Sequence, residues 1–77
     1  MNSSEIIKDL MKDNGLTFQR LAELLGSTTS TISDRVNRNR SGMRVDSLVK
    51  MLEVMDCELV VRSRRKGHKE LTVTVDD

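Results

Sequence analysis

The 77-residue sequence predicts a mainly α-helical fold, in which four short helices are followed by a C-terminal β-hairpin or strand pair. Three observations lead to this fold class. Apolar residues recur every three or four positions as far as Met55, which is the period of an α-helix. After Asp56 they alternate at every second position, which is the period of a strand. The chain contains no proline that would interrupt a helix.

The first two helices are short, and each has a recognisable start and stop. The first is predicted over residues 4–12, with Ser3 or Ser4 as its N-cap and Gly15 after its end. The second begins after Thr17, a good N-cap residue, and ends at Gly26. Both carry an apolar stripe at helical spacing, made of Ile6, Ile7, Leu10 and Met11 in the first and of Phe18, Leu21, Ala22 and Leu25 in the second.

The third helix is predicted after Ser27 or Thr28 and continues to about residue 37. Its only large apolar residues are Ile32 and Val36, which lie four positions apart and make a narrow stripe. The remaining face is polar and consists of Thr29, Ser30, Ser33, Asp34 and Asn37. A helix with so little apolar surface gains little from burial, so we expect the chain to use its polar face.

The fourth helix is predicted over residues 45–55, after a loop at 37–43. Its inward-facing residues are expected to be Val45, Leu48, Val49, Leu52 and Met55. Two alternating segments follow, and the residues 65–69 between them contain Gly67, which favours an antiparallel hairpin. We therefore divide the chain into a helical domain at 1–56 and a strand pair at 57–77.

Positive charge is clustered, although the net charge is only +1. Residues 35–44 contain no acid and hold four arginines, Arg35, Arg38, Arg40 and Arg44. Residues 62–69 contain no acid either and hold Arg62, Arg64, Arg65, Lys66 and Lys69. These clusters indicate two basic surfaces, although solvated arginine-rich loops would have the same composition.

Composition excludes several classes of protein. Cys57 is the only cysteine, so no disulfide can form within the chain, and with His68 it is too small a set for a zinc site. No cofactor or metal is predicted. No apolar run approaches the roughly 18 residues of a membrane span, and no signal peptide is visible, so we expect a cytoplasmic protein without a membrane partner. No phosphate-binding loop or nucleophile–base pair indicates an enzyme.

The second and third helices form the most informative motif. Two short helices joined by a three-residue turn must approach closely, which requires a small residue at the contact and a flexible residue in the turn. Ala22 and Gly26 meet these requirements. Leu21, Ile32 and Val36 supply the apolar side chains that would hold the pair together. This spacing is typical of a helix-turn-helix.

From about Ile6 to Met55 the chain resembles the Xre-like family of helix-turn-helix regulators, which includes phage Cro proteins and repressors. The LAELLG and STISDRV segments carry the resemblance. It implies a four-helix, lambda-repressor-like DNA-binding domain whose third helix, at about 28–37, lies in the major groove. The implied partner is double-stranded DNA, bound at an inverted repeat by a homodimer that acts as a transcriptional regulator, most simply a repressor.

The resemblance also implies roles for individual residues. Base contacts are expected from Thr28, Thr29, Ser30, Ser33 and Asp34. Phosphate contacts are expected from Thr17, Gln19, Asn37, Arg38, Arg40 and Arg44. For Asp34, an ion pair with Arg38 one turn away is an equally weighted alternative. The chain departs from the family pattern at Phe18, where glutamine is frequent, and at Arg35, where an apolar residue is usual.

The strands allow three arrangements: a sheet between two subunits, a hairpin packed on the helices, or a docking strand for another protein. We expect the first, because some relatives add C-terminal strands that pair across a dimer. The dimerisation residues would then be Leu59, Val61, Leu71, Val73 and Val75. A second hypothesis for the whole chain is a protein-interaction module, such as an antitoxin or adaptor subunit, whose strands bind an unknown protein partner.

Overall fold

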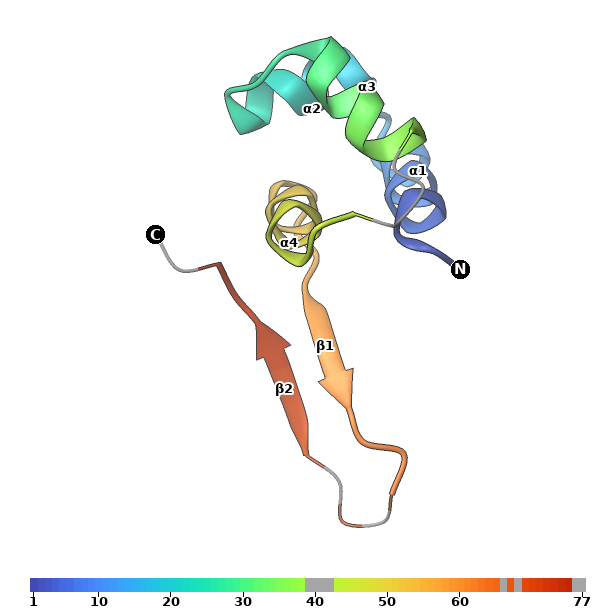
Figure 1. Ribbon diagram of the computed structural model, residues 1–77, viewed down its shortest axis with the longest axis vertical. Helices are drawn as coiled ribbons and strands as arrows, with labels where there is room; N and C mark the ends of the chain where they lie inside the picture. The colour runs from blue at the N-terminus through green and yellow to red at the C-terminus, as the bar shows by residue number, and fades with distance from the viewer. Residues whose placement is uncertain (39–42, 66, 68, 76–77) are drawn as a thin grey trace.

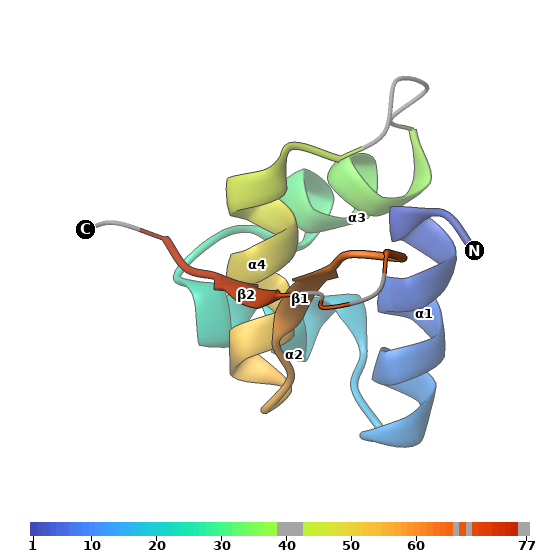
Figure 2. The same cartoon turned by 90° about the horizontal axis from the view of Figure 1, so that it is seen from below.

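The computed structural model describes residues 1–38, 43–65, 67 and 69–75. Four helices pack together, and an antiparallel two-stranded hairpin extends from them (Figures 1 and 2). The elements are α1 (Ser3–Asp13), α2 (Phe18–Leu25), α3 (Thr29–Asn37), α4 (Val45–Val54), β1 (Leu59–Arg62) and β2 (Glu70–Val73). The predicted fold class, four helices with a C-terminal strand pair, is confirmed.

Side-chain caps fix the starts of the first three helices. Thr17 caps α2 and Thr28 caps α3, and each hydroxyl accepts a backbone N–H bond three residues on, at 3.2 Å and 3.3 Å. The predicted N-cap of α1, Ser3 or Ser4, was wrong, because the side chain of Asn2 caps the helix by accepting the Glu5 N–H at 2.9 Å. Ser3 instead accepts the Met43 N–H at 3.3 Å, which ties α1 to the segment before α4.

Three helices end in the same backbone motif. The residue that follows the last turn is left-handed in each: Gly15 has φ 63°, Gly26 has φ 64° and Asp56 has φ 57°. The next residue donates its N–H back to a carbonyl five positions earlier, from Leu16 to Met11, from Ser27 to Ala22 and from Cys57 to Leu52, at 2.8–2.9 Å. These bonds satisfy carbonyls that a helix end would otherwise leave exposed.

The buried core comes from all four helices and consists of Ile7, Met11, Leu21, Ala22, Ile32, Val36, Val49, Met51, Leu52 and Met55. One prediction for α4 was wrong, because Val45 is 55% exposed. Val45 is the first residue of α4 and lies beyond the end of the core. The sequence analysis also missed Met51, which is 1% exposed. Met51 belongs to the cluster that α4 shares with the other three helices, whereas Val49 lines the cleft beside β2, so α4 buries residues on more than one side.

The strands pair with each other within the chain. Leu59 lies opposite Val73, and Val61 lies opposite Leu71, so these four side chains share one face of the hairpin. Only the base of this face is covered, where Leu59 packs against the core. Val61 and Leu71 are 55% and 60% exposed. The hairpin therefore projects from the helices with part of its apolar face open to solvent (Figure 1).

Candidate nucleic-acid interface

Helices α2 and α3 are held together by buried side chains at the positions that the motif requires. Leu21, Ala22, Ile32 and Val36 are each at most 2% exposed. Gly26 occupies the turn in the left-handed conformation, and a Cβ added there would meet no atom within 4 Å. Glycine is therefore favoured at this position by its backbone conformation and not by lack of space.

The inward direction of Ile32 and Val36 sets the roll of α3. Thr29, Ser30 and Asp34 are exposed, Asn37 is exposed at the end of the helix, and Ser33 is partly buried. Arg35, which occupies the position where an apolar residue is usual, is exposed on another side of α3. It lines a small cleft with Ser47 and Lys50 of α4. The polar face of α3 and the Arg35 side chain thus point to different sides of the helix.

Several polar side chains on α3 already have partners. The Thr28 hydroxyl accepts the Thr31 N–H as the helix cap and also contacts the Thr31 hydroxyl at 2.7 Å. The Asn37 amide donates to Ser33 Oγ at 3.2 Å. Asp34 forms an ion pair with Arg38, with 3.6 Å between Oδ1 and Nε, which was the alternative role weighed for it. Both members of this pair are largely exposed, so water and salt weaken their attraction.

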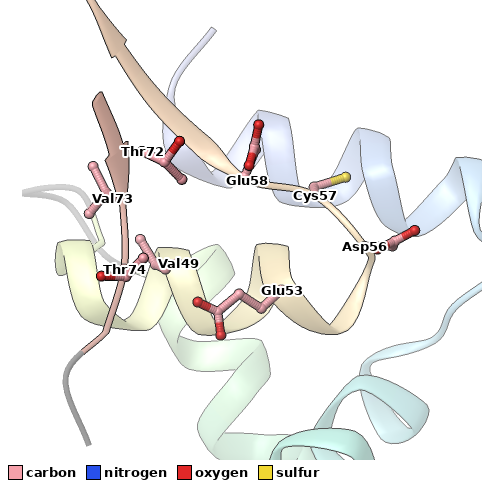
Figure 3. A pocket seen from close by; sticks show the side chains of 8 residues that line it. All are labelled: Val49, Glu53, Asp56, Cys57, Glu58, Thr72, Val73 and Thr74. Carbon is pink, nitrogen blue, oxygen red and sulfur yellow. The ribbon is translucent and has the colours of Figure 1, made fainter. Parts of the chain in front are cut away.

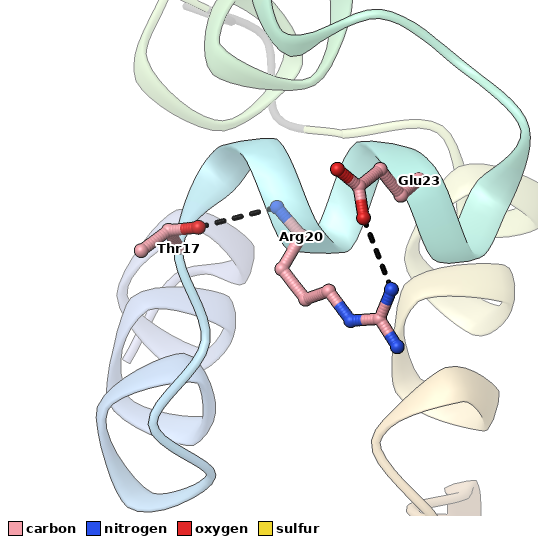
Figure 4. A network of polar contacts seen from close by, with 3 residues as sticks. All are labelled: Thr17, Arg20 and Glu23. Carbon is pink, nitrogen blue, oxygen red and sulfur yellow. Dashed lines mark hydrogen bonds and ion pairs between the residues drawn. The ribbon is translucent and has the colours of Figure 1, made fainter.

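The N-terminus of α2 lies beside the end of α3. Thr17 and Asn37 line the same groove, although twenty residues separate them in the sequence. Figure 4 shows the Thr17 hydroxyl capping α2 through the Arg20 N–H. The Arg20 guanidinium turns along the helix to Glu23, at 3.0 Å. Gln19 is exposed beside the first amides of α2, which lack acceptors within the helix.

The predicted phosphate-binding arginines lie around the connection between α3 and α4. Arg38 follows α3 and Arg44 precedes α4, and both are exposed. Arg44 is the N-cap residue of α4, but its guanidinium has no acceptor and makes no cap bond there. Arg40 lies outside the described residues.

The sequence analysis overlooked two lysines of α1. Lys8 and Lys12 line the groove that contains Thr17 and Asn37, and both are exposed. Their spacing of four residues could have indicated this, since side chains four apart share one side of a helix. In the sequence, each of these lysines precedes an aspartate, so neither belongs to the two basic clusters that contain no acid.

The cleft between α4 and the hairpin has the opposite electrostatic character. Glu53, Asp56 and Glu58 surround it together with Val49 and Val73, and no lysine or arginine of the described part of the chain lines it (Figure 3). In Figure 1, α4 lies between the hairpin and the α2–α3 pair. Carboxylates therefore gather on the side of α4 away from α3, where they would repel a polyanion.

The comparisons with known proteins identify the family. A scan against protein-family models matches residues 7–59 to the Cro/C1-type HTH DNA-binding domain. No curated protein and no solved structure gave a significant match. Among the described residues, no helix is long and apolar enough to cross a membrane, and no group of three or more metal-binding side chains occurs. Because the matched region covers more than half of the chain, from within α1 to the start of β1, the chain belongs to the Cro/C1-type family of helix-turn-helix DNA-binding domains.

Proposed function

We propose that the chain is a sequence-specific transcriptional repressor that binds an inverted-repeat operator as a homodimer. The observation that carries this proposal is that α3 has a buried apolar face and an exposed polar face. Only Ile32 and Val36 hold the helix in the core, while Thr29, Ser30 and Asp34 remain exposed. A helix that enters the major groove needs such short polar side chains to contact base edges.

Two roles follow for the residues around α3. Thr29, Ser30, Ser33 and Asp34 read base edges, whereas Arg38 and Arg44 hold phosphates. Thr28 contributes mainly by capping, because its hydroxyl is already bonded to Thr31. Phosphate contacts add affinity on every sequence, and base contacts change the preference among sequences. These two effects can be measured separately.

The test is a fluorescence-anisotropy titration of the full chain on genomic fragments at several salt concentrations. Arg44→Ala should weaken binding on all fragments and lower the slope of log affinity against log salt by about 0.9. Thr29→Ala should instead change the ranking of the fragments. Binding no tighter to any fragment than to bulk competitor DNA would overturn sequence-specific recognition. An effect of Arg44→Ala on the ranking alone would overturn the assigned roles.

Homodimer formation is supported by the open apolar face of the hairpin. Val61 and Leu71 lie opposite each other and are more than half exposed, which is unfavourable for a chain that remains alone. The Ser63 N–H donates to the Lys69 carbonyl at 3.3 Å. Hydrogen-bonded and non-hydrogen-bonded residue pairs alternate along an antiparallel ladder, so Val60 and Thr72 form a non-hydrogen-bonded pair. The Thr72 amide therefore points to the outer edge of β2, where a second copy could pair. Sedimentation of the full chain should therefore give a dimer.

The same open face supports a second candidate function, in which the hairpin binds a different protein, as in an antitoxin or adaptor subunit. A monomer in sedimentation that still binds DNA would favour this second function. A concentration-dependent dimer favours the first.

A further inference from the structure

We propose that Lys8 and Lys12 of α1 hold the DNA backbone beside the reading helix, in a groove between α1 and the start of α2. This inference rests on the proposed DNA binding and names an additional part of that interface. The groove has a polar rim formed by Lys8, Lys12, Thr17 and Asn37. Figure 4 shows that α2 begins beside α1, so residues from both helices meet there.

The charge of the groove suits an anionic ligand. Among the residues that the structure describes, no aspartate or glutamate lines it. Asp9 and Asp13 each follow one of the lysines, and Asp9 also lies one turn before Lys12, as Glu5 lies before Lys8. The ion pairs among the described residues join Arg20 to Glu23 and Arg38 to Asp34, so neither lysine is ion-paired with a described carboxylate. Glu5, one turn before Lys8, accepts the Asn2 amide at 3.1 Å.

The groove is continuous with the polar face of α3. Asn37 lies on its rim and donates to Ser33, which belongs to that face. A DNA strand whose bases meet Ser33 would continue past Asn37 and Thr17 toward α1. Lys8 and Lys12 are about 6 Å apart along the helix axis, so their ammonium groups can reach separate phosphates of that strand.

The floor of the groove explains why the lysines are needed there. Met11 and Phe18 form much of this floor, and neither side chain can donate a hydrogen bond to a phosphate. Phe18 is also the first residue of α2. The first position of α2 therefore has no side chain that could bind a phosphate. Lysine stems can lie along such an apolar floor while the charged ends reach the rim.

The experiment compares Lys8→Gln, Lys12→Gln and the double variant with the unchanged full chain, on a short mixed-sequence duplex at several salt concentrations. Glutamine removes the charge and keeps most of the stem. Each substitution should lower the salt slope by about 0.9, so the affinity lost between 50 and 200 mM salt shrinks about 3.5-fold per lysine and about 12-fold in the double variant. Lys12→Arg should retain the slope of the unchanged chain.

Lys50→Gln is the matched control, because Lys50 is an exposed lysine of α4 in a cleft beside Gly26 and Ser27, away from the α1 groove. Its slope should remain that of the unchanged chain. If the unchanged chain binds DNA and the Lys8 and Lys12 variants keep its slope, this inference is overturned while the proposed function stands. If the unchanged chain binds no DNA at any salt concentration, both are overturned. Circular dichroism of each variant verifies that the helices remain folded.

Discussion

Asp56 occupies a position that favours glycine, and replacing it should stabilise the protein. It has φ 57° at the end of α4, where α1 and α2 have Gly15 and Gly26 in the same backbone motif. An ordinary L-residue loses about 1–2 kcal/mol in the left-handed region, and aspartate loses somewhat less. Its carboxylate also lies at a helix C-terminus, where a negative charge costs about 0.3–1 kcal/mol. Both terms are absent with glycine.

Substitutions at Asp56 separate these two contributions. Asp56→Gly should raise the free energy of unfolding by about 0.5–1 kcal/mol, after about 0.4–1 kcal/mol is subtracted for the greater freedom of glycine in the unfolded chain. Asp56→Asn should gain only the charge term, about 0.3–1 kcal/mol. Asp56→Ala should leave the free energy of unfolding within about 0.5 kcal/mol of the unchanged chain, because alanine tolerates the left-handed region less well than aspartate but also removes the unfavourable charge.

Urea denaturation followed by circular dichroism measures these differences at one fixed protein concentration, because the stability of the proposed dimer would depend on concentration. In thermal unfolding, Asp56→Gly should raise Tm by about 2–8 °C. Asp46→Asn is the matched control, since Asp46 lies in the first turn of the same helix and its charge should stabilise it. Equal stability of the glycine and alanine variants would refute the reasoning, because only the left-handed backbone distinguishes them strongly.

Three further predictions follow from burial and charge. Ile32→Ala should lower the free energy of unfolding by about 2–5 kcal/mol, because Ile32 is 0% exposed; a loss below about 1 kcal/mol in urea denaturation would contradict its role in holding α3. Asp34→Asn should increase the affinity for mixed-sequence DNA a few-fold in an anisotropy titration, since it removes a negative charge from α3 and frees Arg38. An unchanged affinity would mean that Asp34 and Arg38 do not lie near DNA phosphates. Leu71→Lys should shift sedimentation from dimer to monomer without loss of helical content, whereas Val60→Lys, on the opposite face of the hairpin and on β1, should leave the dimer intact; a dimer that survives Leu71→Lys would exclude the apolar face as the interface.

The features that could be predicted from the sequence depend on local chemistry. Thr17, Thr28 and Gly26 act within a few residues of their own positions, so cap and turn preferences were sufficient to place the ends of α2 and the start of α3. The stripe of Ile32 and Val36 depends only on helical spacing. Because Arg35 stands where an apolar residue is usual, the sequence did not fix how α3 is rotated about its own axis. The burial of Val36 fixes this rotation.

Features that depend on other elements could not be predicted. Met51 is buried in the core that α4 shares with the other three helices, on a side of α4 that also lines a cleft with Leu25 and Arg35, and the spacing of α4 alone does not reveal this. Val45 fits the spacing of the stripe, but the core ends before it. Lys8 and Lys12 gain their place beside Thr17 only through the packing of α1 against the other helices. The sequence allows two roles for Asp34, an ion pair with Arg38 and a contact to a base. The structure without DNA has the ion pair, and bound DNA could replace it with the base contact.

The proposed DNA-reading surface and the proposed subunit interface lie in separate parts of this fold. Helices α2 and α3 are fixed by core residues, whereas Val61 and Leu71 lie outside the core, so substitutions on the hairpin should change oligomeric state without moving α3. The end of α4 at Asp56 and the contact of Leu59 with the core join the two regions. In a dimer this junction would set the distance between two α3 helices, which must match half-sites about 34–36 Å apart. Asp56→Gly keeps the same backbone conformation, so it should increase stability and leave the preferred half-site spacing unchanged. A change in that spacing would mean that the aspartate side chain, and not the left-handed turn, orients the hairpin.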